Sequence, residues 1–164
     1  MIPKIIHYVW VGGKPLTPLA EKCIESWKKF CPDYEIKRWD ETTFDINENV
    51  YCKEAYESKK WAFVSDYIRL KVLYDYGGIY MDTDVEVTKP LDKYLEHHAF
   101  SGFERDELIP TGIIGAEKGN HWIEENLKVY DNRHFIIGKD KLNLTTNVYF
   151  ITNKTKEMYP NIEL

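Results

Sequence analysis

The sequence predicts an α/β fold in which helices flank a mostly parallel β-sheet. Three observations predict it. Residues 4–11 (KIIHYVWV) form a continuous apolar run, which is typical of a strand covered on both faces. A helical pattern and a second strand-like run follow, and this strand–helix–strand order favours parallel pairing. Residues 61–76 form a long helical pattern that ends at paired glycines, directly before another apolar run.

The first half of the chain has a clear order of expected elements. They are a strand over 4–11, a helix over 17–30, a strand over 34–39 and a short helix near 53–58. The helix over 17–30 has an apolar side, which is expected to hold Leu19, Cys23, Ile24, Trp27 and Phe30. The run 34–39 (YEIKRW) alternates in the way that a strand requires.

The second half is less regular. After the helix over 61–76, the expected elements are strands over 79–87, 99–103 and 108–116 and a helix over 120–131. Asn120 is the expected N-cap of that last helix. Beyond Arg133 the periodicity is too weak to assign secondary structure.

The composition is that of an ordinary globular domain. The chain has 164 residues, with 22 Lys and Arg against 27 Asp and Glu, and a net charge of -5. This length suits a single domain, 1–164. A mildly acidic chain without a basic block is a poor candidate for nucleic-acid binding. No apolar run approaches the ~18 residues of a membrane helix.

Neither the N-terminus nor the cysteines indicate secretion. The apolar segment 2–11 has no basic region beyond Lys4 and no small-residue cleavage site, so we expect no export and a cytoplasmic location. Cys23, Cys31 and Cys52 have neither a disulfide framework nor zinc-ligand spacing, so we expect reduced thiols.

Two charged residues lie away from the solvent side of the helix over 61–76. Lys71 and Asp75 mark its solvent stripe, and at ~100° per residue Asp66 and Arg69 point elsewhere. They are three residues apart and can pair. A charge turned toward the interior or a cleft is paired, hydrogen-bonded or functional. The two are therefore either a buried structural ion pair or part of a polar ligand site.

An acidic motif follows the paired glycines. In the segment 80–84 (YMDTD), strand alternation places Tyr80, Asp82 and Asp84 on one face. Mg²⁺ and Mn²⁺ bind one or two carboxylates together with water and substrate phosphates. A lone Asp-x-Asp is more often a polar strand end. The apolar strand and the charged helix before it favour a metal site here.

Trp10 ends the first strand just before another pair of glycines. Ligands of open α/β sheets bind beyond the carboxyl ends of the strands, so Trp10 can stack on a base, although a core position is equally open. His7 is expected to be structural. No metal-ligand spacing connects the other histidines considered, which are His97, His98 and His121.

Three blocks of the sequence resemble a known family. They are residues 2–13 (IPKIIHYVWVGG), 65–69 (SDYIR) and 77–84 (GGIYMDTD). In this order they are similar to glycosyltransferase family 32, whose sugar-transferase region contains a DXD motif. That family includes bacterial capsular and surface polysaccharide enzymes and yeast initiating mannosyltransferases. The same blocks resemble the catalytic core of clostridial glucosylating toxins, and the resemblance runs from residue 2 to about 132.

The resemblance implies a GT-A fold, a Rossmann-like sheet that binds a nucleotide-sugar with Mn²⁺ or Mg²⁺ on its diphosphate. It implies transfer with retention of anomeric configuration. By this resemblance Trp10 stacks on the nucleotide base, with Val9 beside it. Asp66 and Arg69 hold ribose and sugar hydroxyls, with Ser65 adjoining them.

The resemblance also assigns the acidic motif. Tyr80 lies beside the donor, Asp82 is the first DXD aspartate near ribose and sugar, and Asp84 is the direct metal ligand. The cation would stabilise the diphosphate leaving group, and Arg69 would orient the sugar. Asp82, Asp84 and Arg69 are thus the expected catalytic residues, with Asp84 and Asp82 at the metal.

The resemblance leaves the partners partly open. A UDP-sugar is favoured over a GDP-sugar, because the block around Trp10 is closer to the toxin-like pattern. The expected acceptor is a glycan or a lipid-linked oligosaccharide at the inner face of the cytoplasmic membrane, in polysaccharide or capsule biosynthesis. Glu104 and Asp106 are the nearby candidates for a nucleophile, and a front-face mechanism needs none.

The chain departs from the family at its end. Family members run several dozen residues further, through a His- and Trp-containing segment that closes over the diphosphate. The chain stops at Leu164, so we expect that segment to be absent and Asp84 to lack a protein co-ligand. Two alternatives are a non-catalytic nucleotide-sugar-binding module and a haloacid dehalogenase-type phosphatase. The phosphatase pattern wants Thr or Val where Glu86 stands.

Overall fold

A five-stranded sheet forms the centre of the computed structural model, which describes residues 1–102 and 104–164 and, of Asp106, the backbone alone. The strand order is β2-β1-β3-β5-β4. The strands are β1 (Ile5–Val9), β2 (Glu35–Trp39), β3 (Gly78–Met81), β4 (Ala99–Ser101) and β5 (Ile113–Ala116). β1 pairs in parallel with β2 and β3, whereas β5 runs antiparallel to β3 and β4. Four strands therefore share one direction, which confirms the predicted α/β class.

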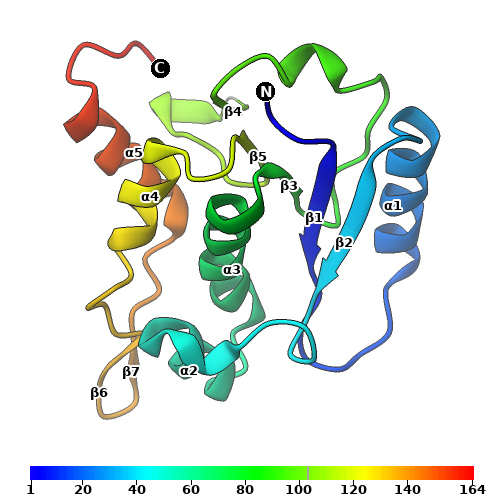
Figure 1. Ribbon diagram of the computed structural model, residues 1–164. Coiled ribbons are helices and arrows are strands. Elements are labelled where there is room, and N and C mark those ends of the chain that lie inside the picture. Colours follow the sequence, from blue (N-terminus) through cyan, green and yellow to red (C-terminus); the bar gives the residue numbers. More distant parts are fainter. Residues whose placement is uncertain (103) are drawn as a thin grey trace.

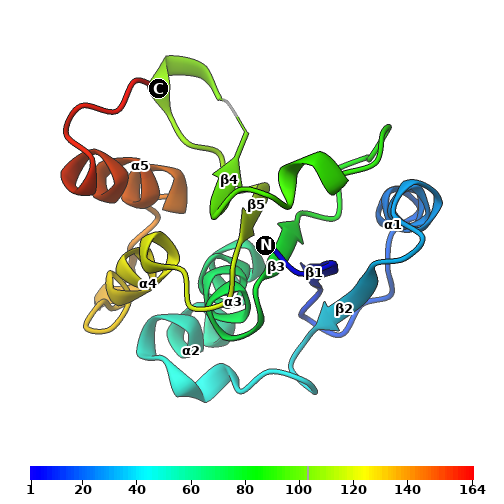
Figure 2. The ribbon, with the colours of Figure 1, turned by 45° about the horizontal axis from the view of Figure 1, so that its top comes forward.

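Helices cover both faces of this sheet (Figures 1 and 2). One face carries α1 (Pro18–Phe30). The other face carries α2 (Val50–Glu57), α3 (Trp61–Tyr76), α4 (His121–Lys128) and α5 (Asn147–Met158). The remaining elements are η1 (Ile46–Glu48), η2 (Asp92–Tyr94), η3 (Arg105–Glu107) and a hairpin of β6 (Ile136–Gly138) and β7 (Lys141–Leu142).

Alternation along the strands divides the core into two layers. On β1, Ile6 packs into the layer under α1, and Val9 packs into the layer that contains α3. On β3, Ile79 and Tyr80 divide in the same way. Both faces of these strands are covered, which explains why their sequences are almost continuously apolar.

α1 begins and ends where its sequence predicts. Thr17 is the N-cap, and its side chain accepts a hydrogen bond from the backbone N–H of Ala20 at 3.2 Å. Trp27 is fully buried, and its indole donates to the carbonyl oxygen of Val85 at 2.8 Å. The expectation for Leu19 is wrong, because this side chain in the first turn is 57% exposed.

All five predicted strands are shorter in the structure, and β1 and β2 lose residues only at their ends. β3 ends at Met81 rather than at 87, because the N–H of Val85 donates to the carbonyl oxygen of Asp82 at 3.0 Å and closes a turn. The strand expected over 108–116 begins only at Ile113. The strand expected over 99–103 ends at Ser101, and its last predicted residue lies outside the described residues.

The tail left unassigned beyond Arg133 holds the β6–β7 hairpin and α5. Glu54 on α2 anchors the hairpin by accepting the backbone N–H groups of Phe135 and Ile136 at 3.0 and 2.9 Å. No helix in the described part of the chain is both long and apolar enough to span a bilayer.

Candidate functional site

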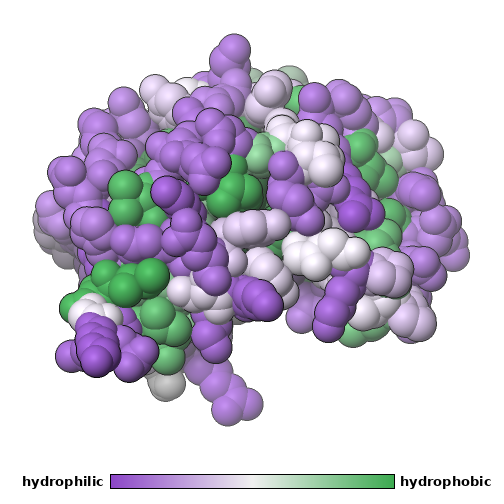
Figure 3. All heavy atoms as spheres, turned by 90° about the horizontal axis from the view of Figure 1, so that it is seen from below, coloured by the Kyte–Doolittle hydropathy of each residue, from purple (hydrophilic) through white to green (hydrophobic). Residues whose placement is uncertain are grey.

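A cavity of about 490 Å³ opens at the carboxyl ends of β1 and β3. These strands point to the lower side of the molecule in Figure 1, and Figure 3 looks onto that side, where pale side chains of intermediate hydropathy gather near the middle. The cavity wall includes the expected site residues Val9, Trp10, Ser65, Arg69, Tyr80, Asp82 and Asp84. The other expected residue, Asp66, lies behind Arg69 and is 8% exposed.

Arg69 on α3 organises the back wall of this cavity. The side chain is almost fully buried, and Nη2 lies 3.3 Å from Asp66 Oδ1 and 3.3 Å from Asp82 Oδ1. Nη2 also donates to Ser65 Oγ at 2.8 Å. Nη1 donates to the carbonyl oxygen of Thr111 at 2.7 Å. The predicted pairing of Asp66 with Arg69 is therefore present, and it extends to the acidic motif.

Tyr80 links β3 to the acidic motif. Its hydroxyl donates to Asp82 Oδ1 at 2.7 Å, so these two side chains share one side of the strand, as alternation predicts. The guanidinium carbon of Arg69 lies 4.4 Å from the centroid of the Tyr80 ring, within the range of a cation–π contact. Asp82 Oδ1 thus accepts a hydrogen bond from the phenol and forms an ion pair with the guanidinium. Among the described residues, none donates a hydrogen bond to Oδ2.

Asp84 reaches the cavity by a different route from the one predicted. It lies in the turn after β3 rather than on the strand, so alternation does not place it beside Tyr80. The side chain is exposed, and no described residue donates a hydrogen bond to its carboxylate. A turn that presents two carboxylates to one cavity suits a hard divalent cation with open positions for phosphate oxygens. The residues present therefore fit Mn²⁺ or Mg²⁺.

Trp10 lines the cavity on the β1 side. Its indole is half-buried, and Nε1 donates to the carbonyl oxygen of Lys14 at 2.8 Å, which fixes the ring. Gly12 follows with φ +100°, and a Cβ at this position would lie 2.8 Å from the Trp61 ring. Only glycine combines this backbone conformation with so close an approach. The loop therefore packs tightly against the start of α3.

Sequence reasoning did not find every residue of the cavity. Lys14, Thr17 and Trp61 also line it. Lys14 follows the first strand in the loop where ligands of α/β sheets bind, and that position could have identified it. Thr111, which holds Arg69, carries no local signal, because it lies 42 residues away along the chain.

Burial determines the protonation of the site. Burial raises the pKa of Asp66 to about 6, although Arg69 opposes the rise. Burial alone would lower the pKa of Arg69, but the carboxylates of Asp66 and Asp82 raise it above its ordinary value. Burial also raises the pKa of Tyr80, so its phenol stays protonated and donates to Asp82. The cavity wall therefore contains the cationic Arg69, which lies between the acidic side chains of Asp66 and Asp82 and the neutral phenol of Tyr80.

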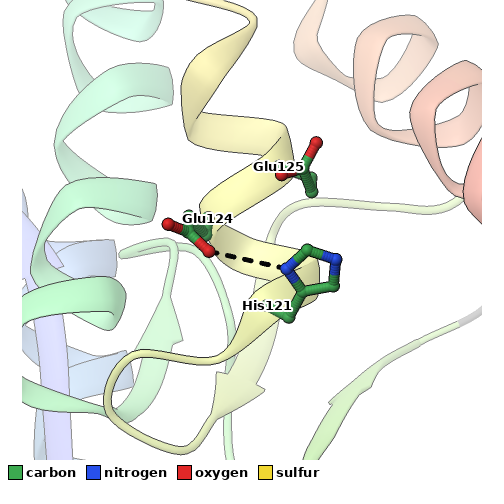
Figure 4. Close-up of side chains that lie close together, drawn as sticks. All are labelled: His121, Glu124 and Glu125. Atoms are coloured by element: carbon green, nitrogen blue, oxygen red, sulfur yellow. Dashed lines mark hydrogen bonds and ion pairs between the residues drawn. The ribbon is translucent and has the colours of Figure 1, made fainter.

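A second cluster lies at the start of α4. Ligating atoms of His121, Glu124 and Glu125 lie within 4.8 Å of one another, and Figure 4 shows the imidazole turned toward Glu124. No metal-ligand spacing was expected at His121, but one turn of α4 brings these three side chains together. Lys128 already pairs with both carboxylates, at 3.9 Å from Glu124 and 2.8 Å from Glu125. We assign no ion to this exposed cluster.

The nucleophile candidates receive no support from their surroundings. Glu104 is exposed and does not line the cavity. The side chain of Asp106 lies outside the described residues. His98 is exposed, and its Nδ1 lies within hydrogen-bonding distance of Glu117 Oε2 at 2.8 Å, which agrees with a surface role.

The sheet and the acidic cavity at its carboxyl edge define an α/β protein of the GT-A type. Residues 18–101 match the family described as "Glycosyltransferase sugar-binding region containing DXD motif", and the chain belongs to this family.

The similar curated proteins are much longer than this chain. "Inositol phosphoceramide mannosyltransferase 3" of Schizosaccharomyces pombe is 30% identical over 74% of this chain and 35% of that protein. "Mannosyl phosphorylinositol ceramide synthase SUR1" of Saccharomyces cerevisiae is 31% identical over 83% and 37%. "Subversion of eukaryotic traffic protein A" of Legionella pneumophila is 28% identical over 76% and 24%. The chain therefore spans between 24% and 37% of the length of these relatives.

Solved structures agree on the fold. The structure titled "PaToxG Glycosyltransferase" superimposes with a TM-score of 0.75 at 20% identity, over 99% of this chain and 71% of that one. A structure titled "Structure of Transferase mutant-C23S,C199S" gives a TM-score of 0.61 at 12% identity, over 99% and 88%.

Proposed function

We propose that this chain is the donor-binding part of a metal-dependent retaining glycosyltransferase, which moves a sugar from a nucleotide diphosphate-sugar to a glycan or lipid-linked acceptor. One observation carries the proposal. Arg69, Tyr80 and Asp82 form a bonded cluster on the wall of a 490 Å³ cavity, and the Asp84 carboxylate stands beside it without a protein donor among the described residues. Family membership supports the same conclusion.

Different residues of the cavity would bind different parts of the nucleotide-sugar donor. Trp10, fixed through Lys14, would stack on the base, with Val9 beside it. Asp84 and the free oxygen of Asp82 would hold Mn²⁺ or Mg²⁺. When bound, the cation supplies Lewis-acid stabilisation of the diphosphate leaving group.

Arg69 and its neighbours would orient the sugar. The guanidinium is held rigidly and stays cationic. Its N–H groups already have acceptors within the protein, so Arg69 would orient the sugar through its fixed positive charge and by holding the Asp82 carboxylate in place. Asp66 and Ser65 support that orientation, and Asp82 accepts from hydroxyls on the donor. Retention of configuration is part of this proposal, and the described residues support a front-face transfer better than a double displacement through Glu104.

The proposal extends to the base of the donor and to the place where the protein acts. A UDP-sugar is the first candidate and a GDP-sugar the second. The printed names of two fungal relatives describe mannosyl transfer, which keeps the second open. We propose a cytoplasmic site of action, at the inner face of the cytoplasmic membrane, in polysaccharide or capsule biosynthesis.

A non-catalytic nucleotide-sugar-binding module is the alternative, since no base or nucleophile stands at the cavity among the described residues. Family membership leaves the phosphatase interpretation without support. Hydrolysis of the donor in the presence of Mn²⁺ would favour the transferase, and tight binding without hydrolysis would favour the module.

A thermal-shift titration with UDP and GDP, with and without Mn²⁺, tests the donor site. A nucleotide at about 100 times its Kd adds roughly 2.7 kcal/mol to the free energy of unfolding. We expect this stabilisation only when one nucleotide and the cation are both present. Equal stabilisation without Mn²⁺ would contradict the metal site, and no stabilisation with either nucleotide would contradict the donor site.

A further inference from the structure

The orientation of Arg69 depends on a loop that lies outside the matched family region. Thr111, in the loop before β5, accepts from Arg69 Nη1 twice, through its carbonyl oxygen at 2.7 Å and its Oγ1 at 3.2 Å. The next residue, Gly112, accepts from the backbone N–H of Asp82 at 2.8 Å. The same short loop therefore holds both the cation and the first aspartate of the cavity.

Helix α5 fixes this loop from behind. Thr111 Oγ1 donates to Asn147 Oδ1 at 2.8 Å, and Thr152 Oγ1 accepts from the N–H of Ile109 at 2.9 Å. Both α5 residues are buried, as are Thr111 and Arg69. α5 lies on the same side of the sheet as α3 (Figure 2), so a segment 78 residues distant along the chain reaches the back of the site.

The direction of these hydrogen bonds follows from their chemistry. A guanidinium can only donate, so the Thr111 hydroxyl accepts from Arg69 and has one hydrogen to give. That hydrogen goes to the Asn147 carbonyl, which places the Asn147 amide nitrogen on the far side. Bonds aligned in this way strengthen one another in a buried setting.

Asn147 continues the network to a small cavity. Its Nδ2, the Oδ1 of Asn126 and the hydroxyl of Tyr130 have no hydrogen-bond partner among the described residues. All three side chains line a cavity of about 10 Å³ that also borders Thr111. That volume is close to the minimum for one water molecule, which would satisfy these atoms together.

We propose that Asn147 is a positioning residue for the donor site, acting on Arg69 through Thr111. The inference rests on the proposed function only for its effect on binding of the nucleotide-sugar, since the hydrogen bonds themselves form without that ligand. A buried, directional network of this kind holds a functional side chain to the narrow range of angles that catalysis and specific binding need. α5 is therefore part of the structure that positions the donor site.

Side-chain NMR of Arg69 in the unliganded chain tests the network directly. In the wild type we expect separate, slowly exchanging Nη–H signals, because rotation of the guanidinium is blocked. Thr111→Val and Asn147→Leu should merge or broaden these signals, and Thr111→Ser should keep them because it retains the hydroxyl. Unchanged Arg69 signals in both Thr111→Val and Asn147→Leu would overturn the proposal.

Thr155→Val is the matched control. Thr155 lies on the same helix and is buried, but its hydroxyl accepts from the indole of Trp122 on α4 and has no bond to Arg69. This variant should lower stability and leave the Arg69 signals intact. If Thr155→Val broadened them as strongly as Asn147→Leu, the effect would come from loosening of α5 in general and the proposal would fail.

Donor binding separates this inference from the proposed function. With Mn²⁺ and UDP-glucose or GDP-mannose, whichever stabilises the wild type, we expect roughly tenfold weaker binding in Asn147→Leu and near-normal binding in Thr155→Val. Weaker binding in Arg69→Ala but unchanged binding in Asn147→Leu would overturn the positioning role alone. Unchanged binding in Arg69→Ala would contradict the proposed function, and the NMR result would still decide the network.

Discussion

Asp84 differs from the other acidic residues of the cavity in its surroundings. Asp66 and Asp82 are held by Arg69, whereas Asp84 is exposed in a turn and receives no hydrogen bond from a described residue. Removing its carboxylate therefore breaks nothing that holds the fold together. An oxygen ligand with two free oxygens at a cavity mouth is suited to share a cation with phosphate.

Asp84→Ala should abolish the Mn²⁺-dependent part of nucleotide binding and leave the melting temperature without ligand unchanged. Isothermal titration of the nucleotide with and without Mn²⁺ measures this directly. Glu86→Ala is the control, because Glu86 is an exposed carboxylate two residues away that does not line the cavity. A Mn²⁺-dependent affinity that survives in Asp84→Ala would remove the metal assignment.

Trp10 lies on the β1 side of the cavity, where the nucleotide base is proposed to bind. Its ring is half-buried and fixed by Lys14, so the stacking surface exists before the ligand arrives. Trp10→Ala should weaken nucleotide binding by ~1–3 kcal/mol, the usual scale of base–aromatic stacking. Trp10→Phe should recover part of that loss because it keeps an aromatic face. Equal affinity in the wild type and Trp10→Ala would show that Trp10 serves only the core.

At the scale of elements, the turn from α3 into β3 decides where the acidic motif lies. Gly78 has φ +118°, and a Cβ at this position would approach the carbonyl oxygen of Ile5 to 2.6 Å and His7 Nε2 to 3.1 Å. These neighbours belong to β1, so they cannot move without disturbing the pairing of β1 with β3. The glycine allows the two strands to meet beside the end of α3.

Gly78→Ala should therefore be severely destabilising, by about 3 kcal/mol or more, through overpacking added to backbone strain. Urea unfolding of the variant measures the loss. Gly119→Ala is matched, because Gly119 has φ +69° but nothing lies within 4 Å of its Cβ position, so only strain of about 1–2 kcal/mol applies. Similar losses in both variants would show that close packing at Gly78 contributes nothing.

The elements differ in how far their sequences predict them. α3 has the predicted bounds, because a long helical pattern and the paired glycines mark both its length and its end. α5 was not predicted, because three of its four buried residues are the polar Asn147, Thr152 and Thr155 and leave no apolar stripe. β3 is shorter than predicted because a turn, rather than a change of residue type, ends it.

The same division holds for the site across the whole molecule. Residues on α3 and after β3 could be proposed from the sequence, since helix periodicity turned Asp66 and Arg69 away from the solvent stripe and the family resemblance joined them to Asp82. Thr111 and Asn147 could not, because their role comes from hydrogen bonds between segments far apart in the chain. Local sequence patterns do not predict hydrogen bonds between such distant segments.

His7 connects three elements at the centre of the molecule. Its Nε2 lies 2.8 Å from the carbonyl oxygen of Gly77, after α3, and its Nδ1 lies 3.0 Å from the indole nitrogen of Trp39 on β2. An indole can only donate, so Nδ1 accepts and Nε2 carries the hydrogen. The ring is therefore neutral in the folded protein. Burial lowers its pKa to about 4, with Lys37 adding to the shift and the Gly77 hydrogen bond and Glu35 opposing it.

This pKa makes stability depend on pH. Unfolded His7 titrates near its ordinary value of about 6.5, so between about pH 6.5 and 4 the unfolded state binds more protons than the folded state. The contribution of His7 is therefore complete above about pH 6.5 and is lost as the pH falls toward 4. The maximal loss is about 3 kcal/mol. Asp66 acts in the opposite direction, because its raised pKa of about 6 makes protonation stabilising over the same range.

A comparison with His7→Gln separates the two residues. Glutamine can also accept from Trp39 and donate to Gly77, but it does not titrate, whereas Asp66 is the same in both proteins. The wild type should be more stable than the variant near pH 7, and this advantage should shrink by about 2–3 kcal/mol as the pH falls to about 4. Urea unfolding at a series of pH values measures the difference. If the difference in stability stayed constant with pH, folded and unfolded His7 would bind a proton equally well. That result would contradict the lowered pKa expected for a buried ring bonded to a carbonyl and an indole.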